Sequence, residues 1–563
     1  MKIKLNIFFI LIILIGFLFR FIKIPYFPPA VNWDEVSHGF NAYSILKTGT
    51  DESGFRFPIV NFRAYGDYPL PLNLYLTIPA ISIFGLNEFS IRLPHMVLGV
   101  ITVIATYYLI LGLTQKKEAG LLTAFLVAVG PWYFFTSRIV LQSNISIFLL
   151  ITAMSLFVNR NKNRYLLPIS ILLLTLSLFA YHTTRIFSPI FLLCLIFLYR
   201  KEFWGLFKIR KIHACLSIFL IATFYIILFP IFLNSTSRAR SQWVFLIDQG
   251  VVNRIIEKRQ NSKLSPIITR FIYNRPTFFA KEFISNYLGY FSPDFLFLKG
   301  GTQYQFSLPE KGLLYMVNLP LFYIGLIILF IKGFIKKEKV YQLVLFWLLL
   351  APIPASITNE KFAVLRSTSL LPLPEFLTVL GLFFLLNLIK KRNALKIGIL
   401  IIYSLGLLFG ITTYLTKLIN EYPKKYSWAW QYGYQDVVNY AKTNYLNYDK
   451  VIVTKKYGEP HEFFLFFWPW NPAEYKKDLN LVRFYQLNWY WVDSFDKFYF
   501  VNDWQIINKE NPQEFILESG SSVSCLKSRC LLITSPDNVS KGWKKVKTVN
   551  YLDGKPAFEL YEN

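Results

Sequence analysis

The chain has 563 residues, of which 54% are hydrophobic and 18% aromatic, and its mean hydropathy is +0.39. This composition, with repeated apolar runs of about 20 residues, excludes an ordinary soluble protein and predicts a polytopic membrane protein. The formal net charge of +27 would suit a nucleic-acid-binding protein, but the basic residues are placed differently, between the apolar runs.

Eleven apolar stretches are predicted to be membrane-spanning helices. They are 5–22, 90–113, 119–136, 144–158, 165–180, 186–199, 214–233, 313–333, 340–357, 367–388 and 397–415. The fold class expected is therefore a polytopic α-helical membrane protein.

The loops on one side of these spans are strongly basic. They hold 20 Lys and Arg against three Glu, in the N-terminus, 114–118, 159–164, 200–213, 332–339 and 389–396. By the positive-inside rule these loops are cytoplasmic, and eleven crossings place the C-terminus outside the cytoplasm. We therefore expect a plasma-membrane protein that contacts membrane lipids and no nucleic acid.

An acidic pair, Asp34-Glu35, follows the first span in a long extracytoplasmic loop, 23–89. Carboxylates at a membrane surface are costly to desolvate, so the pair suggests chemistry there. The alternative is that Asp34 is the N-cap of a short helix. The loop continues through Asp67 to the apolar run 72–86, which is predicted to be an interfacial or re-entrant helix.

Two further segments are long and extracytoplasmic. The loop 234–312 is basic at first and aromatic later, and loops of this length are usually functional. In the tail, 420–563, hydropathy drops, and the pattern predicts an amphipathic helix over 434–445 and strands at 450–454, 498–501 and 531–534. We expect 1–419 to form a transmembrane catalytic domain and 420–563 an extracytoplasmic α/β domain.

Cys525 and Cys530 lie in the tail, separated by four mostly polar residues and followed by an apolar strand. A hairpin turn would place them opposite each other, within reach of a disulfide that would persist outside the cytoplasm. The alternative is two free, partly buried thiols. Cys194 and Cys215 fall in or beside spans and are interpreted as inert packing, and no Cys/His cluster typical of a metal site occurs.

Several ionisable residues lie in the first loop or at the outer ends of predicted spans, where the fold could gather them. A carboxylate such as Asp34 would accept a proton from an incoming nucleophile, and arginines would hold an anionic leaving group such as a lipid phosphate. The candidate phosphate ligands are Arg138, Arg185 and Arg366, with snorkelling at the interface as the alternative for each. The candidate site-lining residues are His38, Tyr181, His182 and Glu360; structural hydrogen bonding is the alternative for both histidines, and a solvated loop charge for Glu360.

The order of several motifs resembles one family. These motifs are Asp34-Glu35 after the first span, Gly66-Asp67-Tyr68, the segment 84–94, Ser137-Arg138, the segment 181–189 and the segment 351–356. Over about residues 1–380 the chain resembles the GT-C glycosyltransferases, in the branch of protein O-mannosyltransferases and lipid A aminoarabinose transferases.

The resemblance implies a GT-C-like fold and transfer of a sugar, with inversion, from a polyprenyl-phosphate-linked donor to an extracytoplasmic protein, lipid or cell-surface glycan. It implies that Asp34 is the catalytic carboxylate, Glu35 its neighbour and Asp67 a second acid of the site. The family's lysine after that acid is replaced here by the segment 69–71, and an acid after the third span by the segment 142–144. No cofactor is certain, a divalent metal is left open, and metal ligands are unknown.

Two other functions remain as alternatives. One is a transporter or flippase of lipid-linked glycans, against which stand the odd number of spans and the lack of repeated halves. The other is a non-catalytic scaffold that displays the tail domain.

Overall fold

The computed structural model describes residues 7–23, 26–163, 165–202, 211–233, 244–389, 392–486, 489–507 and 513–563. The chain forms two compact units. The helical unit comprises 1–22, 96–137 and 141–415, and the sheet unit comprises 23–95, 138–140 and 416–563. The sheet unit therefore combines the tail from residue 416 onward with the long loop that follows the first apolar helix.

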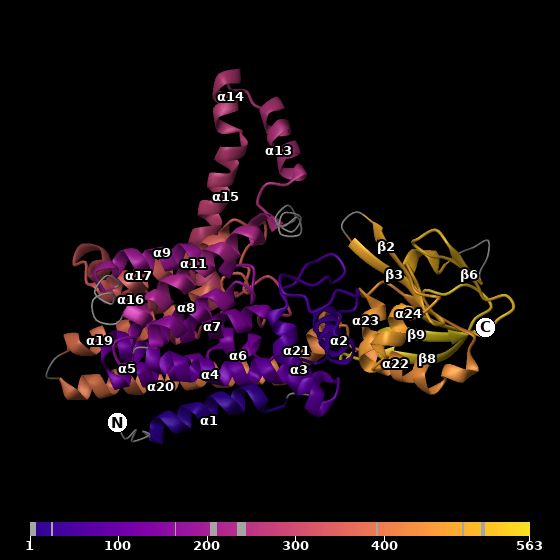
Figure 1. Ribbon diagram of the computed structural model, residues 1–563, viewed down its shortest axis with the longest axis horizontal. Helices are drawn as coiled ribbons and strands as arrows, with labels where there is room; N and C mark the ends of the chain where they lie inside the picture. The colour runs from indigo at the N-terminus through magenta and orange to yellow at the C-terminus, as the bar shows by residue number, and fades with distance from the viewer. Residues whose placement is uncertain are drawn as a thin grey trace. The chain divides into compact units, whose positions relative to one another are not determined.

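The helical unit consists of apolar helices of different lengths (Figure 1). They are α1 (Ile7–Phe21), most of α4 (Glu88–Thr114), α5 (Lys117–Val129), α6 (Pro131–Thr136), α7 (Gln142–Val158), α8 (Leu166–Ser177), α9 (Thr184–Leu198), α11 (Lys211–Leu233), α16 (Leu319–Phe330), α17 (Lys339–Leu350), α18 (Ile353–Ser356), α19 (Leu373–Leu388) and α20 (Asn393–Thr416).

Among the described residues, five helical segments are long and apolar enough to cross a membrane. They are Glu88–Thr114, Met316–Ile335, Lys339–Ser356, Thr368–Leu388 and Asn393–Trp430. Helix is present in each of the eleven predicted stretches, so the helical membrane fold is confirmed. The number of eleven crossings is not established, because α8 and several others are shorter than the ~20 residues of a straight crossing.

One predicted span, 119–136, is two helices rather than one. Helix α5 ends at Val129, Gly130 adopts an extended conformation, and Pro131 begins α6. Proline has no backbone N–H and clashes with the preceding turn, so it is tolerated at the start of a helix and not inside it. Gly130-Pro131 therefore marks the break between the two helices, which the apolar pattern alone does not show.

The loop between α11 and α16 contains three amphipathic helices that form an arm: α13 (Gln249–Gln260), α14 (Pro266–Ile272) and α15 (Arg275–Gly289) (Figure 1). Aromatic residues Phe279, Phe283 and Tyr287 recur every fourth residue of α15 and stack with ring centroids 5.9 Å apart. The basic start of this loop, 234–243, and the basic residues at 203–210 and 390–391 lie outside the described residues.

The tail forms a mixed β-sheet of seven strands among its described residues, which confirms the predicted α/β character. Their order is β2-β3-β4-β1-β7-β9-β8, where β1 is Lys450–Thr454, β2 Val482–Gln486, β3 Trp489–Phe495, β4 Phe498–Val501, β7 Cys530–Thr534, β8 Lys544–Asn550 and β9 Pro556–Glu562. Strand β1 is parallel to both β4 and β7, and the other pairs are antiparallel. The strands predicted at 450–454, 498–501 and 531–534 are confirmed.

The central strand β1 is buried on both faces, which explains its unbroken apolar run. Val451 and Val453 point to one face and Ile452 to the other, as alternation along a strand requires. On the second face lies a small hairpin of β5 (Glu514–Ile516) and β6 (Ser522–Ser524).

On the first face the sheet packs against helices from both parts of the chain. These are α2 (Trp33–Thr48), α3 (Leu72–Phe84), α22 (Tyr434–Thr443) and α23 (Pro460–Phe467), with α24 (Pro472–Lys477) beside α2. Phe40 of α2 and Phe463 of α23 share one apolar core with Val451 and Phe498. Gly39 allows close approach, because a Cβ there would lie 2.8 Å from the ring of Phe466. Loop and tail therefore fold as one body.

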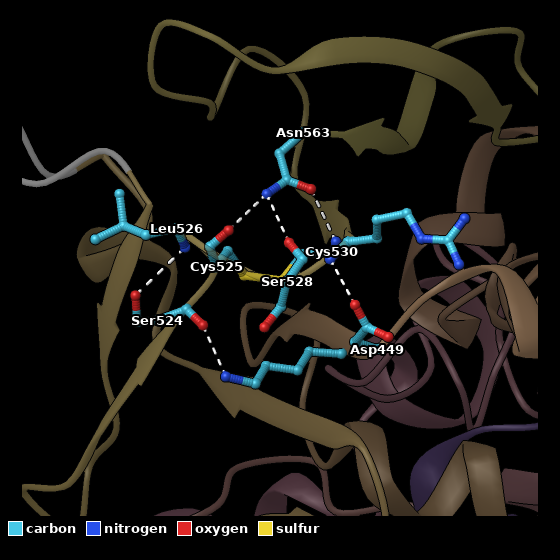
Figure 2. The surroundings of a disulfide bond; sticks show 9 residues. Asp449, Ser524, Cys525, Leu526, Ser528, Cys530 and Asn563 are labelled. Atoms are coloured by element: carbon cyan, nitrogen blue, oxygen red, sulfur yellow. Dashed lines mark hydrogen bonds between the residues drawn. A yellow bond between two sulfur atoms is a disulfide. The ribbon is translucent and has the colours of Figure 1, made fainter.

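Cys525 and Cys530 form the predicted disulfide, with their Cα atoms 6.0 Å apart (Figure 2). The predicted hairpin between them is wrong: β6 pairs with β5, whereas β7 pairs with β1 and β9. The disulfide thus joins the small hairpin to the large sheet. The side chain of Asn563 caps the turn, donating to the carbonyls of Cys525 and Ser528 and accepting from the amide of Cys530.

Candidate active site and an acidic histidine cluster

The N-terminus of α2 is closed by a capping box that does not use Asp34. The Asn32 side chain accepts from the Glu35 amide at 3.0 Å, and the Glu35 carboxylate accepts from the Asn32 amide at 3.3 Å. The N-cap is therefore Asn32, and the alternative that Asp34 is the cap is wrong. Asp34 occupies the second position of the helix, where its carboxylate is available for another role.

Glu35 is fully buried and is held by a paired arginine. Arg92 Nε and Nη2 donate to the two carboxylate oxygens at 2.9 and 2.7 Å, in a bidentate ion pair. The amide of Val140 donates to the same carboxylate at 3.0 Å. Glu35 thus ties together α2, the first turns of α4 and the segment 138–140. This geometry fits a structural anchor for its neighbour Asp34.

Asp34 accepts a hydrogen bond from the hydroxyl of Tyr65. Burial raises the pKa of Tyr65 well above its ordinary value, and the charge of Asp34 adds to this rise, so the phenol stays a donor. The ring of Tyr65 lies between Trp33 and Trp489, with centroids 5.9 and 5.8 Å away. A strand of the tail therefore helps to orient the side chain that holds Asp34.

Trp489 lies directly on the loop that carries Asp67. A Cβ at Gly66 would be 2.0 Å from the indole, so only glycine permits this contact. Asp67 forms a tight turn with Ala64 through reciprocal backbone hydrogen bonds of 2.8 and 3.1 Å. Its side chain accepts from the amide of Tyr68 at 2.7 Å and is half-buried.

His38 lies one turn after Asp34 on α2, and its Nδ1 is 2.6 Å from the Asp34 backbone carbonyl. Its ring packs edge-on against Phe62. Burial lowers the pKa of His38, while the carboxylates of Asp34 and Asp67 act to raise it. The structure therefore brings Asp34, Glu35, His38 and Asp67 into one unit with Tyr65.

The three candidate arginines are distributed over both units. Arg138 belongs to the sheet unit and donates twice to the carbonyl of Phe27, at 3.1 and 2.8 Å. Arg185, in the first turn of α9, is buried and donates to the carbonyl of Leu178 at 3.0 Å. Arg366 belongs to the helical unit and is described next.

Arg366 and Glu360 form an ion pair of 3.3 Å in the loop between α18 and α19. Glu360 also accepts from Gln303 at 2.9 Å, and burial raises the pKa of Glu360. Glu360 is therefore bound by two partners and is not merely a solvated loop charge. Tyr181 and His182 are half-buried and form the turn that precedes α9, their carbonyls accepting from the amides at 184 and 185.

A second cluster of ionisable residues surrounds His461, in the first turn of α23. The ring Nε2 lies 3.7 Å from Glu52 and 3.8 Å from Glu462, and Nδ1 lies 3.6 Å from Glu459. Glu52 also accepts from the Tyr475 hydroxyl at 3.1 Å. Glu52, His461 and Glu462 are all buried and form a group that could hold a metal ion.

Burial and mutual repulsion give the acids of this cluster different pKa values. Burial raises the pKa of Glu462 well above its ordinary value, and the charge of Glu52 contributes to the rise. Burial alone would also raise the pKa of Glu52, but His461, Arg483 and Tyr475 together lower it to about 2. The cluster is not evident from the sequence, because Glu52 lies in the first long loop whereas Glu459, His461 and Glu462 lie in the tail.

A segment of the chain that includes parts of both units matches a known family. Residues 67–229 match the family described as dolichyl-phosphate-mannose-protein mannosyltransferase. The resemblance expected from the motifs is confirmed over this segment, which includes Asp67, Arg138 and Arg185 but neither Asp34 nor Arg366. No curated protein matches the chain.

Solved structures of two other proteins resemble the chain at low identity. ArnT from Cupriavidus metallidurans bound to undecaprenyl phosphate is 11% identical, with 99% of this chain and 97% of that chain covered and a TM-score of 0.48. The Archaeoglobus fulgidus oligosaccharyltransferase tethered with an acceptor peptide is 15% identical, with 81% of this chain covered and a TM-score of 0.48. The matched region spans 62% of the length of that oligosaccharyltransferase.

Proposed function

We propose that this protein is an integral-membrane glycosyltransferase that moves a sugar from a polyprenyl-phosphate donor to an extracytoplasmic acceptor. The observation that carries the proposal is the environment of Asp34. Asn32 and Glu35 form the capping box of α2, so Asp34 is not needed as the helix cap, and Tyr65 orients the Asp34 carboxylate. The family match over 67–229 supports the class of reaction.

In the proposed reaction Asp34 is the general base. The nucleophilic oxygen or nitrogen of the acceptor attacks the anomeric carbon while its proton passes to the Asp34 carboxylate. The bond between the anomeric carbon and the phosphate oxygen breaks, and both electrons leave with the lipid phosphate. The anomeric centre has oxocarbenium character during the displacement, and a single displacement inverts it. Asp67 is proposed as the second acid of the site, with His38 lining it.

The lipid phosphate already leaves well, so it needs cations rather than a strong acid. We propose that at least one of Arg138, Arg185 and Arg366 binds it, because a guanidinium can make two parallel hydrogen bonds to a phosphate. Replacement of that arginine by lysine should weaken apparent donor affinity about tenfold while keeping the charge. Unchanged donor affinity in all three lysine variants would show that the phosphate is held elsewhere.

The topology proposed for this reaction has the N-terminus in the cytoplasm and the C-terminus outside it. Its support is the charge bias of the loops. A reporter enzyme that functions only outside the cytoplasm should be active when it is fused after Asn563. Activity of a cytoplasmic reporter at the same position would reverse the orientation.

The proposal is tested with a strain that lacks the gene. Mass spectrometry should find a surface glycan, glycolipid or glycoprotein that loses one sugar, together with accumulation of a polyprenyl-phosphate sugar. Detergent-solubilised membranes that contain the protein should then restore the missing sugar to membranes of the deletion strain. A flippase or a scaffold would give no product in detergent, because no bilayer remains to be crossed, and that result would contradict the proposal.

A further inference from the structure

His461 is surrounded by three buried carboxyl groups. The carboxylates of Glu52, Glu459 and Glu462 all lie within 3.8 Å of its ring nitrogens. Among the described residues, Arg483 is the one arginine or lysine in an ion pair with any of the three, at 3.7 Å from Glu52. Three buried carboxyl groups thus have one guanidinium beside them, and ionising all three would be costly without a further cation.

The distances within this cluster are too long for hydrogen bonds and suit a shared cation. The separations of 3.7 and 3.8 Å from His461 Nε2 to Glu52 and Glu462 exceed the ~3.2 Å limit of a good N–H···O bond. Two ligands bound at about 2.1 Å to one metal lie about 3.4 Å apart at a tetrahedral angle and about 3.6 Å apart at a trigonal angle. The observed separations are close to these values.

Two polar atoms of the cluster also lack hydrogen-bond partners. They are Oε2 of Glu462 and Nδ1 of His461, on side chains that are 1% and 4% exposed. Buried polar atoms in proteins are almost always paired, so each such atom requires an explanation. The Glu462 carboxylate faces Glu52 and His461, and a metal ion between the three would satisfy it.

We propose that Glu52, His461 and Glu462 bind a divalent transition-metal ion of the zinc class. One imidazole nitrogen and two carboxylate oxygens are ligands that zinc accepts at about 2.0–2.2 Å, whereas magnesium and calcium prefer oxygen alone. The Glu459 carboxylate lies 3.6 Å from the other ring nitrogen, on the side from which carboxylates commonly orient metal-binding histidines. The ion is separate from the donor phosphate and the proposed transfer.

The proposed ion would join the two parts of the sheet unit. Glu52 follows α2 and its amide donates to Asn41 of that helix at 2.9 Å. Glu462 lies on α23, which packs against α2. Metal binding would therefore hold α2 against α23 and keep Asp34 in register with Tyr65. Its role is positioning rather than catalytic.

The test uses the full chain, purified in detergent, stripped with EDTA and then exposed to ZnCl₂ or MgCl₂. Metal retained after gel filtration is measured by inductively coupled plasma mass spectrometry, and thermal unfolding is followed with and without each salt. We expect about one zinc and no magnesium per chain, and an unfolding temperature raised by zinc alone. His461→Gln and Glu462→Gln should each weaken zinc binding at least 100-fold, and Glu459→Gln about 10- to 100-fold.

Glu518→Gln is the matched control, because Glu518 is a carboxylate of the same sheet unit whose ion pair is with Lys455 rather than with His461. It should retain one zinc. Wild-type protein that retains no zinc and shows no shift in unfolding temperature would overturn the proposal without recourse to any variant. Equal zinc binding by wild type and His461→Gln would overturn it as well. Neither measurement depends on transferase activity.

Discussion

The two acidic clusters of the sheet unit balance their charge in different ways. At the start of α2, the buried carboxylate of Glu35 is matched by one guanidinium, that of Arg92, and by backbone amides. Around His461 lie three carboxyl groups, and among the described residues Arg483 is ion-paired with Glu52 alone. The first cluster is complete within the chain and serves to hold the helix. The second is complete only with a further cation. Removing a carboxylate should therefore destabilise the first cluster strongly and the second one little.

The largest effect is expected from breaking the complete pair. Glu35→Gln leaves the buried Arg92 with only the more distant, partly exposed Glu88 as a counter-charge, which should lower the free energy of unfolding by about 3–5 kcal/mol. Thermal and denaturant unfolding of the purified protein measure this loss. Glu88→Gln is the control, since Glu88 is 28% exposed and 3.9 Å from the same arginine, and it should cost less than about 1 kcal/mol. Equal losses in the two variants would contradict the structural role of Glu35.

The disulfide between Cys525 and Cys530 allows an effect on stability to be distinguished from an effect on function. Replacing Cys525 and Cys530 together by serine removes a crosslink that closes a very short loop, worth about 2 kcal/mol in the chain-entropy account. The unfolding temperature should fall, while zinc content and transfer per folded molecule stay unchanged. A change in either of those two readings would mean that the turn communicates with the clusters.

A smaller effect is expected at the hydrogen bond between Tyr65 and Asp34. Tyr65→Phe keeps the ring between its tryptophan neighbours and removes only the hydroxyl, so transfer should fall about tenfold with little change in unfolding temperature. The control is Tyr445→Phe, which removes a similar tyrosine–aspartate bond elsewhere in the sheet unit. Transfer lost equally in both variants would assign the effect to folding rather than to Asp34.

The smallest change in the free energy of unfolding is expected at Glu462. In the presence of EDTA, Glu462→Gln should change the free energy of unfolding by about 1 kcal/mol or less, because the amide keeps the shape and removes a repelled carboxyl group. Unfolding in denaturant gives the value. A loss as large as that of Glu35→Gln would show that the two clusters are balanced alike.

The sequence predicted those elements whose type depends on the local hydrophobic pattern. The apolar stretches are helical, the strand 450–454 is β1, and the helix at 434–445 is α22. The alternative that Asp34 caps α2 is wrong because Asn32 is an equally good cap, and only the backbone conformation distinguishes them. The hairpin at Cys525 failed because strand pairing depends on the whole sheet rather than on the turn.

The residues that the sequence could not predict are those joined by folding over long distances. Glu52 lies in the first loop and His461 in the tail, and no spacing rule connects them. Trp489 was likewise missed, although Gly66 beside Asp67 is the residue that admits it. Arg92 lies in a motif that suggested the family, but its bond to Glu35 became evident only when α4 was seen against α2.

The most direct test of the central claim is the rate of transfer by Asp34→Asn, measured in the detergent assay at equal amounts of folded protein. Asparagine keeps the shape of the side chain and can still accept from Tyr65, but it cannot take the proton from the acceptor. The account predicts a fall of about 10²–10⁴-fold, with an unchanged unfolding temperature. The control Asp436→Asn, at an exposed acid in the first turn of α22, should be fully active. Near-normal transfer by Asp34→Asn would contradict the account.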